Sequence, residues 1–478
     1  MTSAFFKELY PYTKDELYKV FGDYTNICIK KLKEYSILKT IKTVDKNTDL
    51  SELEELEIII DEDDSETEHL YVFTFVGVII VNGFVLKCYP KYIFSNPTPT
   101  NELVQIVSVL EKYNAKEQII KIYANNQKDK EFNRLAAIIY LLLDYYENGI
   151  YNNTKDILEA NGNGEINWNR TVNNTFAVLQ NNQPFYVELQ TTKHQYDNYD
   201  FIKRLHEYVL TVCSKELEEA ALLDLFGLSP AELSDENFDD FGDKDYVLYQ
   251  IEKEINVQFN TRKISLLNTL YMFINDDGTL IDNSTLSLYG TTSFHSIWEE
   301  VCAEIMNNKL QTKLSKLRLP LPLHESYKSL KNKRLIDIIE KPIWVDISGE
   351  PHKTSKTLIP DLISIKGDAF YIFDAKYYNL TLEPRKELKG YPGVGDVAKQ
   401  YLYQLAYKDF IELHGFKSIR NCFLMPIEGD EVVNKGFVKM KILSQLGLKD
   451  VEVRKIPAKK AYHLYLTNQR MDITELNL

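Results

Sequence analysis

The chain has 478 residues, of which 44% are hydrophobic and 26% are charged, and its formal net charge is -14. This length exceeds what one hydrophobic core usually serves, so two or three domains are expected. The negative charge repels nucleic acid and excludes a protein that coats DNA nonspecifically. Any contact with DNA must therefore come from a local basic surface or from a partner.

The five cysteines lie far apart, without the paired spacing of a zinc site or of a small disulfide framework. No apolar run reaches the roughly 18 to 20 residues that cross a bilayer. The N-terminal residues also lack the basic and then apolar segments of an export signal. We therefore expect a protein of the reducing cytoplasm that does not contact a membrane.

The N-terminal part is expected to combine helical segments with one clear hairpin. Apolar residues spaced by three or four predict helix over residues 12–42. The acidic stretch 49–68 predicts a solvated turn. In residues 71–93, two β-branched and aromatic runs meet at Asn82-Gly83, a dipeptide typical of a tight hairpin turn.

Helical patterns recur over residues 101–148 and 200–225, and the composition changes near Ser293. Between Lys309 and Lys356, eleven Lys or Arg residues stand against five Asp or Glu residues, although the chain as a whole is acidic. This stretch either faces a phosphate backbone or is a solvated lysine-rich surface.

The segment LIPDLISIKGDAFYIFDAKYY, residues 358–378, places charged groups in a strongly apolar and aromatic run. Asp361 begins one strand, the chain turns at Gly367, and the returning strand carries Asp374 and Lys376. Strand alternation puts Asp374 and Lys376 on the same face, and the hairpin brings Asp361 opposite them. Two carboxylates and one ammonium group are therefore expected to converge.

Such charges cost several kcal/mol per ion to bury unless each is compensated. A divalent cation compensates two carboxylates, and magnesium prefers oxygen ligands and commonly lies between carboxylates and a phosphate. Lys376 can orient the attacking water or neutralise the charge that develops on the phosphate. The arrangement predicts phosphodiester hydrolysis with Mg2+, or with Mn2+ in its place.

An upstream amphipathic helix over residues 293–310 carries two adjacent acids, Glu299 and Glu300. Either acid can complete the metal site, or both are exposed helix charges.

A downstream helix over residues 396–410 places Gln400, Gln404 and Tyr407 on one face. An amide on that face can hold the lysine or a DNA phosphate, or the stripe is an ordinary polar face.

Four features follow one another in an order that resembles the PD-(D/E)xK nuclease superfamily. They are the helical acid, the Pro-Asp strand start, the apolar strand that ends in Asp-x-Lys, and the glutamine-bearing helix. The segment IWEEVCAEI is similar to the acid-bearing helix of McrC-type nucleases, which maps the acid onto Glu299. The hairpin that ends in Pro90-Lys91 is similar to the N-terminal hairpin of that group. With GEINWNRTV and LHEYVLTVC, these features resemble the LlaJI-type restriction endonuclease family over most of residues 70–430.

This resemblance implies an α/β (α+β) protein whose nuclease domain has a mixed central sheet flanked by helices. The expected divisions are an N-terminal partner-docking domain, a mostly helical middle region, the nuclease domain and a C-terminal extension, at residues 1–100, 101–290, 291–440 and 441–478.

The resemblance also implies an endonuclease subunit of a multi-component restriction or anti-phage system, coupled to a McrB-like GTPase of the AAA+ type that recognises and translocates DNA. The expected catalytic residues are Asp361, Asp374, Lys376 and Glu299. The three acids and the Ala375 carbonyl are expected to hold the metal ion. Related nucleases often place Gln and Tyr four residues apart, whereas Gln404 and Tyr407 are three apart, so either Gln400 or Gln404 can be the supporting glutamine.

Two alternatives remain at this stage. The chain can be a non-catalytic scaffold that stimulates the GTPase, or an endonuclease that cuts without a partner. The chain has no Gly-x-x-x-x-Gly-Lys-Ser/Thr loop, so it is not expected to hydrolyse a nucleotide itself.

Overall fold

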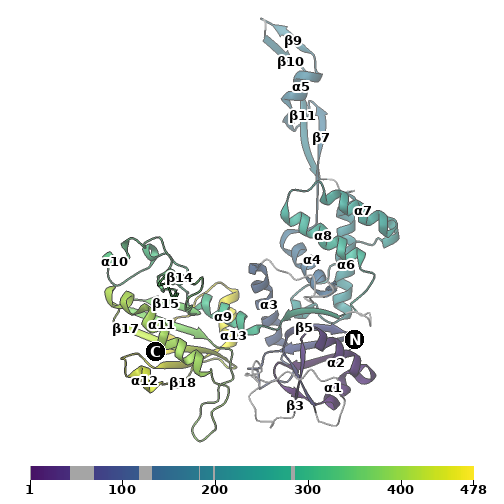
Figure 1. Ribbon diagram of the computed structural model, residues 1–478. Helices are drawn as coiled ribbons and strands as arrows, with labels where there is room; N and C mark the ends of the chain where they lie inside the picture. Colours follow the sequence, from purple (N-terminus) through teal and green to yellow (C-terminus); the bar gives the residue numbers. More distant parts are fainter. Residues whose placement is uncertain (1, 43–68, 118–131, 182, 197–199, 281–285) are drawn as a thin grey trace. The chain divides into compact units, whose positions relative to one another are not determined.

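Several β-sheets with helices packed beside them make up the chain in the computed structural model, which describes residues 2–42, 69–117, 132–181, 183–196, 200–280 and 286–478 (Figure 1). Two compact units divide the chain, one of residues 1–120 and 288–478, the other of residues 121–287. The acidic turn predicted at 49–68 lies outside the described residues.

The N-terminal part of the first unit contains two small sheets. The first has the order β1-β6-β5-β12, and its strands are β1 (Thr2–Lys7), β6 (Phe84–Tyr89), β5 (Val76–Val81) and β12 (Leu286–Thr291). The second has the order β2-β4-β3, and its strands are β2 (Pro11–Tyr12), β4 (His69–Phe73) and β3 (Leu38–Lys42). The predicted hairpin is confirmed, because β5 and β6 pair antiparallel about Asn82-Gly83, whose φ angles are 48° and 76°.

The helix predicted over residues 12–42 is wrong at its C-terminal end. Helices α1 (Lys14–Phe21) and α2 (Thr25–Glu34) are present, but the chain then turns at Ser36, whose φ of 57° is incompatible with a continuing helix. Residues 38–42 instead pair antiparallel with β4. Tertiary pairing therefore overrides the apolar spacing in this segment.

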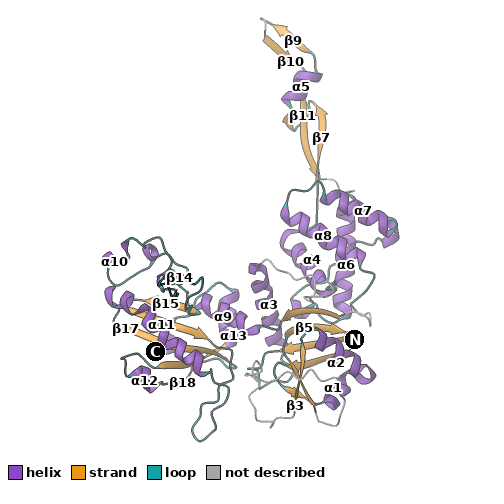
Figure 2. Cartoon of the chain, viewed as in Figure 1, coloured by secondary structure: helices purple, strands orange, loops and turns teal. Residues whose placement is uncertain are grey.

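The second unit has a helical part and a strand part (Figure 2). Its longer helices are α4 (Arg134–Asn148), α6 (Phe201–Glu219), α7 (Lys244–Ile255) and α8 (Thr261–Asn275). Its strand part contains a three-stranded sheet of order β7-β11-β8, the strand pair β10-β9 and the short helix α5 (Trp168–Asn174). The strands are β7 (Thr154–Ala160), β8 (Glu165–Ile166), β9 (Ala177–Gln180), β10 (Gln183–Tyr186) and β11 (Gln190–Tyr196). With α3 (Thr100–Glu117) of the first unit, α4 and α6 confirm the helices predicted within 101–148 and 200–225.

The C-terminal part of the first unit is built on a five-stranded sheet of order β15-β16-β17-β19-β18. Strands β16, β17 and β19 run parallel, and β15 and β18 pair antiparallel at the two edges. Their bounds are β15 (Leu362–Lys366), β16 (Ala369–Ala375), β17 (Ser418–Ile427), β18 (Val433–Val438) and β19 (Val451–Pro457). The expected mixed sheet is therefore present, and residues 451–457, from the segment expected as an extension, supply an internal strand of it.

The helices of this part are α9 (Phe294–Ile305), α10 (Glu325–Lys328), α11 (Val394–Leu413), α12 (Lys441–Ser444) and α13 (Ala458–Leu466), and a short hairpin pairs β13 (Ile343–Val345) with β14 (Pro351–Lys353). Within the described ranges, no helix has both the length and the apolar character that crossing a bilayer requires.

Helices α9 and α11 are fixed to this sheet by different kinds of contact. Tyr403 and Tyr407 of α11 pack into a core cluster with Phe370 and Ile372 of β16. From α9, the fully buried Trp298 donates its indole N–H to the carbonyl oxygen of Leu424 at 3.1 Å. An aromatic side chain so anchored fixes the helix in register with the sheet, since both its ring and its N–H find partners.

The substitution Trp298→Ala is expected to destabilise the fold by about 3 to 5 kcal/mol, because it leaves a cavity and removes a buried hydrogen bond. Trp344 is the matched control, since its side chain is 70% exposed; Trp344→Ala should change stability by about 0.5 kcal/mol or less. Thermal and urea unfolding of the two variants measures the difference. Equal losses would show that Trp298 does not anchor α9.

Candidate active site

The hairpin of β15 and β16 places the predicted acids at one end of the five-stranded sheet. Leu362 pairs with Phe373 and Lys366 with Ala369, so Asp361, just before β15, lies beside the end of β16. A carboxylate oxygen of Asp361 accepts a hydrogen bond from the backbone N–H of Ala375 at 2.9 Å. The hairpin expected from the sequence is thus present, with Asp361 and Asp374 on neighbouring strands.

The two aspartates are close enough to repel each other when both are ionised. Burial raises the pKa of Asp361 to about 8, and the charge of Asp374, a hydrogen bond with its side chain and the charge of Glu299 act in the same direction. Lys376 opposes the shift. Asp374 itself is only 5% exposed. The pair is therefore an acidic site that lacks enough positive charge to ionise fully at neutral pH.

Lys376 lies between two carboxylates. Its Nζ is 3.0 Å from Asp374 and 3.3 Å from Asp396, which belongs to the first turn of α11. Burial lowers the pKa of Lys376, but the charges of these two aspartates outweigh burial and raise it. The lysine is thus held as a cation, on the same face as Asp374, as strand alternation predicts.

Asp396 was not among the residues expected at the site. Its signal in the sequence is helical spacing, because it lies four residues before Gln400 and so shares a face of α11 with it. Tyr403 follows on the same helix, and its hydroxyl donates to the carbonyl oxygen of Ile359 at 2.8 Å. Burial and the charges of Asp374 and Asp361 raise the pKa of Tyr403. Helix α11 therefore brings Asp396 and Tyr403 to the aspartates and Lys376.

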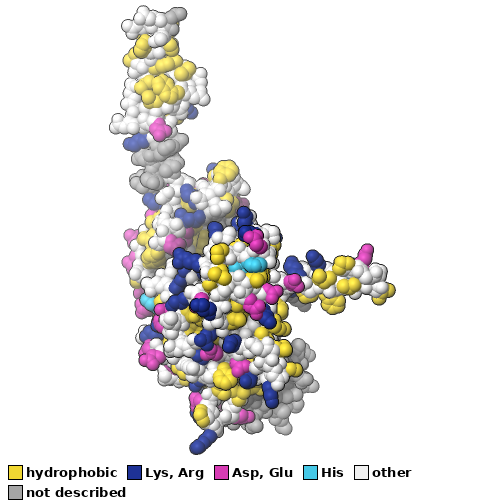
Figure 3. Space-filling view, turned by 90° about the vertical axis from the view of Figure 1, so that its left-hand side faces the viewer, with side chains coloured by type: hydrophobic (Ala, Val, Ile, Leu, Met, Phe, Trp, Pro, Cys, Tyr) yellow, Lys and Arg dark blue, Asp and Glu magenta, His cyan; other side chains and the backbone are white. Residues whose placement is uncertain are grey.

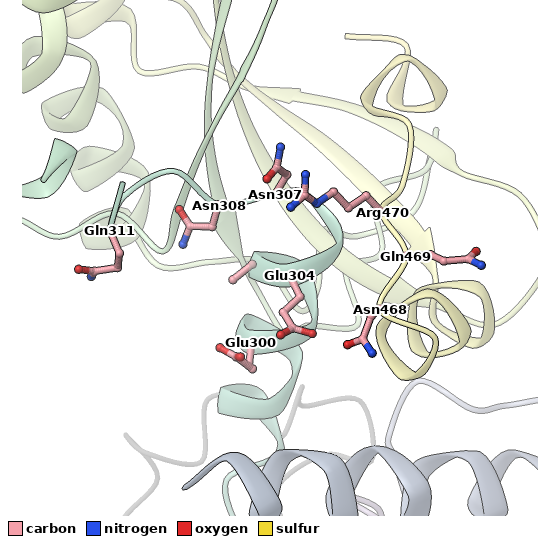
Figure 4. A pocket seen from close by; sticks show the side chains of 9 residues that line it. Glu300, Glu304, Asn307, Asn308, Gln311, Asn468, Gln469 and Arg470 are labelled. Carbon is pink, nitrogen blue, oxygen red and sulfur yellow. The ribbon is translucent and has the colours of Figure 1, made fainter. Parts of the chain in front are cut away.

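The adjacent acids of α9 have different surroundings. Burial raises the pKa of Glu299; the charges of His295 and Lys376 oppose this shift and that of Asp374 adds to it. Glu300 instead lines a hollow of about 370 Å3 (Figure 4). The other lining residues of this hollow are mostly amides and charged groups: Ala303, Glu304, Asn307, Asn308, Gln311, Asn468, Gln469 and Arg470. Of the two acids, Glu299 is the one coupled to the aspartates.

Asn308 joins this hollow to the aspartate site. Its amide nitrogen donates to the carbonyl oxygen of Asp361 at 3.3 Å, and its amide oxygen accepts from the backbone N–H of Leu310 at 3.0 Å and of Ile363 at 3.1 Å. These bonds fix the start of β15 to the end of α9. The side chain is a structural brace for Asp361.

The two candidate glutamines differ in whether their amides are already used. Gln404 donates to the carbonyl oxygen of Lys449 at 2.8 Å and accepts from the N–H of the same residue at 2.9 Å. Gln400 is fully buried, and within the described residues neither its amide nitrogen nor its amide oxygen has a hydrogen-bond partner. A buried unpaired amide is costly and calls for a partner, so Gln400 is the glutamine with capacity to bind.

Another acidic cluster lies in the β13–β14 hairpin. Among the described residues, only Asp346, Glu350 and His352 place three potential ligand atoms within 4.8 Å of one another, and all three are exposed. Asp346 accepts hydrogen bonds from the backbone N–H groups of Ser348 and Glu350 at 2.8 and 3.0 Å. This pattern is that of a capped turn, so it accounts for the cluster without a metal ion. Glu299 is thus coupled to the aspartates by charge but does not form such a trio with them.

Comparison with known proteins identifies relatives over most of the chain. The family profile described as LlaJI restriction endonuclease matches residues 75–335 and 331–458. A protein of Bacillus subtilis (strain 168), named Type II restriction enzyme BsuMI component YdjA, is 28% identical over 420 residues, which are 85% of this chain and 83% of that protein.

Two solved assemblies align with the chain more distantly. One, described as a refined half-complex of Thermococcus gammatolerans McrB AAA+ hexamers with bound McrC, gives a TM-score of 0.38 at 12% identity over 98% of this chain and 99% of that chain. The other, a cryo-EM structure of the McrBC complex of the same organism, gives 0.24 at 10% identity over 62% and 85%.

The substitution Asp361→Asn is expected to stabilise the metal-free protein at alkaline pH. The pKa of Asp361 is about 8 in the folded protein and about 4 in an unfolded chain, so the folded state loses stability as pH rises from 4 to 8. Asparagine carries no charge, so the variant should gain about 1 to 3 kcal/mol at about pH 8.5 and almost nothing near pH 4. Unfolding with a chelator present measures this gain.

Asp368 provides the control, because it lies at the other end of the same hairpin and pairs with Lys417 at 3.3 Å. Asp368→Asn should give no gain at either pH. A wild-type protein whose stability does not fall between pH 4 and 8 relative to Asp361→Asn would contradict the raised pKa.

Proposed function

Because the chain belongs to the LlaJI restriction endonuclease family, we propose that it is the DNA-cleaving subunit of a multi-component restriction system and that the Asp361–Asp374–Lys376 cluster hydrolyses the phosphodiester bond. The observation that carries this proposal is the crowding of carboxylates around one lysine. Asp374 and Asp396 contact Lys376, and Asp361 and Glu299 are coupled to the same group by charge.

The donor set fits a divalent metal ion. The raised pKa of Asp361 records a deficit of positive charge that a cation would relieve. We assign the ion to carboxylate oxygens of Asp361 and Asp374 and to the Ala375 carbonyl, with Glu299 acting through water, because magnesium prefers oxygen ligands and retains several waters. When bound, Mg2+ or Mn2+ would polarise the scissile phosphate and the attacking water. These assignments describe a PD-(D/E)xK site.

The role of Lys376 follows from its charge. The neighbouring carboxylates raise its pKa, so it remains protonated at neutral pH and is a poor general base. A fixed cation at this position stabilises the negative charge that develops on the phosphate oxygens during attack by water. Of the two roles that the sequence left open, we therefore favour charge neutralisation.

A local basic surface beside the site suits the DNA backbone. The pKa of Lys309 is lowered by burial and by the charges of Arg470 and Arg318, so these three cations are close neighbours. The backbone N–H of Lys309 donates to the carbonyl oxygen of Ile363, two residues after Asp361. Figure 3 shows clusters of Lys and Arg among scattered acids on one face of the molecule. Phosphate contacts there would position the duplex without reading its sequence.

A protein partner completes the proposal. The Bacillus subtilis relative is named as a component of a restriction enzyme, that is, as one part of a larger enzyme. We propose that this chain is likewise one part of a larger enzyme. We propose a McrB-like GTPase of the AAA+ type as the partner, on the McrC-like motifs of the sequence. Apolar side chains exposed on the strand part of the second unit, such as Phe176 at 98% and Val187 at 76%, suit a protein interface.

The substitutions Asp374→Asn and Lys376→Ala should each lower DNA cleavage by about a hundredfold or more when the full chain is assayed with its partner. Asp374→Asn should also weaken Mn2+ binding by about tenfold or more, whereas Lys376→Ala should retain it, because the lysine is not a ligand. Lys366→Ala, at the turn end of the same hairpin, is the matched control and should cleave normally. Cleavage that survives both site substitutions would refute the assignment.

A second experiment distinguishes the roles of Gln400 and Gln404. Gln400→Ala removes the proposed supporting amide, so it should lower the cleavage rate by about tenfold. Its amide has no hydrogen-bond partner within the described residues, so this variant should lose less stability than Gln404→Ala. Gln404→Ala breaks two hydrogen bonds to Lys449, so it should lower stability by about 1 to 3 kcal/mol. Single-turnover cleavage and thermal unfolding of both variants measure these effects. The reverse pattern would make Gln404 the supporting residue.

A further inference from the structure

The first sheet of the N-terminal part sends two loops out from the same end. Strands β1 and β6 run parallel, with Lys7 opposite Tyr89. The backbone N–H of Glu8, directly after β1, donates to the carbonyl oxygen of Tyr89 at 2.8 Å. Glu8 and the residues that follow β6 therefore leave the sheet together, and Lys91 is two residues beyond its end.

Glu8 is a buried carboxylate, and a residue of the nuclease part binds it. The hydroxyl of Tyr377 donates to a carboxylate oxygen of Glu8 at 2.5 Å, and the backbone N–H of Lys91 donates to the same oxygen at 3.2 Å. Glu8 is 6% exposed. Burial raises the pKa of Glu8, and the charge of Lys91 and these two hydrogen bonds oppose the rise. Burying a carboxylate costs free energy, and these hydrogen bonds offset part of that cost.

Lys91 holds the same segment from a second direction. Its carbonyl oxygen accepts from the side-chain amide of Asn379 at 3.0 Å. Its ammonium group lies 4.7 Å from the ring centre of Tyr377 and 5.7 Å from that of Tyr378. Cation–π contacts of this kind gain strength when they are shielded from water, and Lys91 is 7% exposed. Three consecutive residues, 377–379, are therefore bound by Glu8 and Lys91.

These three residues come directly after Lys376, which is the first residue beyond β16. The backbone N–H of Lys376 still donates to the carbonyl oxygen of Leu424 at 2.9 Å. Beyond that bond, Tyr377 is fixed by Glu8 and by packing against Phe294 of α9 at 5.4 Å between ring centres. The residue directly after Lys376 is thus held by Glu8, which follows the first strand of the N-terminal sheet.

We propose that Glu8, Lys91 and Tyr377 form a clamp through which the N-terminal sheet positions Lys376 for cleavage. This inference rests on the proposed function, since it assigns positioning residues to that same site. A lysine side chain has four rotatable bonds, so its ammonium group keeps a fixed place only if its backbone is held. Displacement of a catalytic group by about 1 Å can cost up to about a hundredfold in rate.

The clamp is tested with Glu8→Ala, Glu8→Gln and Tyr377→Phe in the full chain, assayed with its partner for cleavage and alone for Mn2+ binding. Glu8→Ala and Tyr377→Phe should slow single-turnover cleavage by about tenfold. Glu8→Gln keeps an oxygen that can accept from Tyr377, so its rate should stay within about threefold of wild type. Mn2+ affinity should remain within about threefold in all three variants, because Asp361 and Asp374 are untouched.

Tyr92→Phe is the control for general damage to the interface. The Tyr92 hydroxyl donates to that of Tyr462 at 3.0 Å, so this variant loses one buried hydrogen bond between the same two parts. It keeps the aromatic ring, which packs edge-on against Tyr377 at 6.2 Å between ring centres. It should cleave like the wild type. Cleavage at the wild-type rate by Glu8→Ala and Tyr377→Phe, or an equal loss in Tyr92→Phe or in Glu8→Gln, would overturn the clamp.

Failure of the proposed function gives different results from failure of the clamp alone. If Asp374→Asn cleaves normally, or the wild type neither binds Mn2+ nor cleaves, the site assignment and the clamp built on it both fall. If Asp374→Asn is inactive while every clamp variant is active, only the clamp is wrong.

Discussion

Repulsion between the buried Asp374 and the partly buried Asp361 is the constraint on which the rest of the site depends. Asp361 and Asp374 are brought together because β15 and β16 form a tight hairpin, and the backbone N–H of Ala375 fixes one of the two carboxylates. Lys376 cannot neutralise the pair alone, because Asp396 shares it. A cluster of this kind lowers the stability of the folded protein, because its carboxylates outnumber the positive charges beside them.

The surroundings of the cluster limit what each neighbour can do. Gln404 is hydrogen-bonded to the backbone of Lys449, whereas the Gln400 amide has no hydrogen-bond partner within the described residues. Glu300 lines the hollow beside α9, whereas Glu299 is coupled by charge to Asp374 and Lys376. Lys376 stays charged, which suits stabilisation of a transition state better than proton transfer. The segments that follow β1 and β6 contact the residues after β16 through Glu8 and Lys91, so hydrogen bonds connect β16 to the N-terminal part.

Much of this arrangement was predictable from the sequence, for identifiable physical reasons. The hairpins at Asn82-Gly83 and at Gly367 have turn residues that tolerate positive φ between apolar strands, and both are present. The alternation of Asp374 and Lys376 also follows from strand geometry alone. By contrast, β3 lies where apolar spacing predicted helix, because only its pairing with β4 decides its conformation.

The contributions that the sequence could not reveal depend on contacts between distant segments. Asp396 lies twenty residues beyond Lys376, at the start of the glutamine-bearing helix, and only the fold shows that it reaches Lys376. Glu8 lies in a different part of the chain. Strand β19 completes the sheet from a segment that resembled an extension. Local patterns predict elements and turns, but they do not show which elements become neighbours.

The central claim is that Asp361 and Asp374 jointly hold a divalent metal ion, and anomalous diffraction from crystals of the full chain soaked in Mn2+ tests it most directly. One strong manganese peak is expected between the two carboxylates, with the Ala375 carbonyl in the coordination shell. Manganese bound at Asp346, Glu350 and His352 instead, with none between the aspartates, would contradict it.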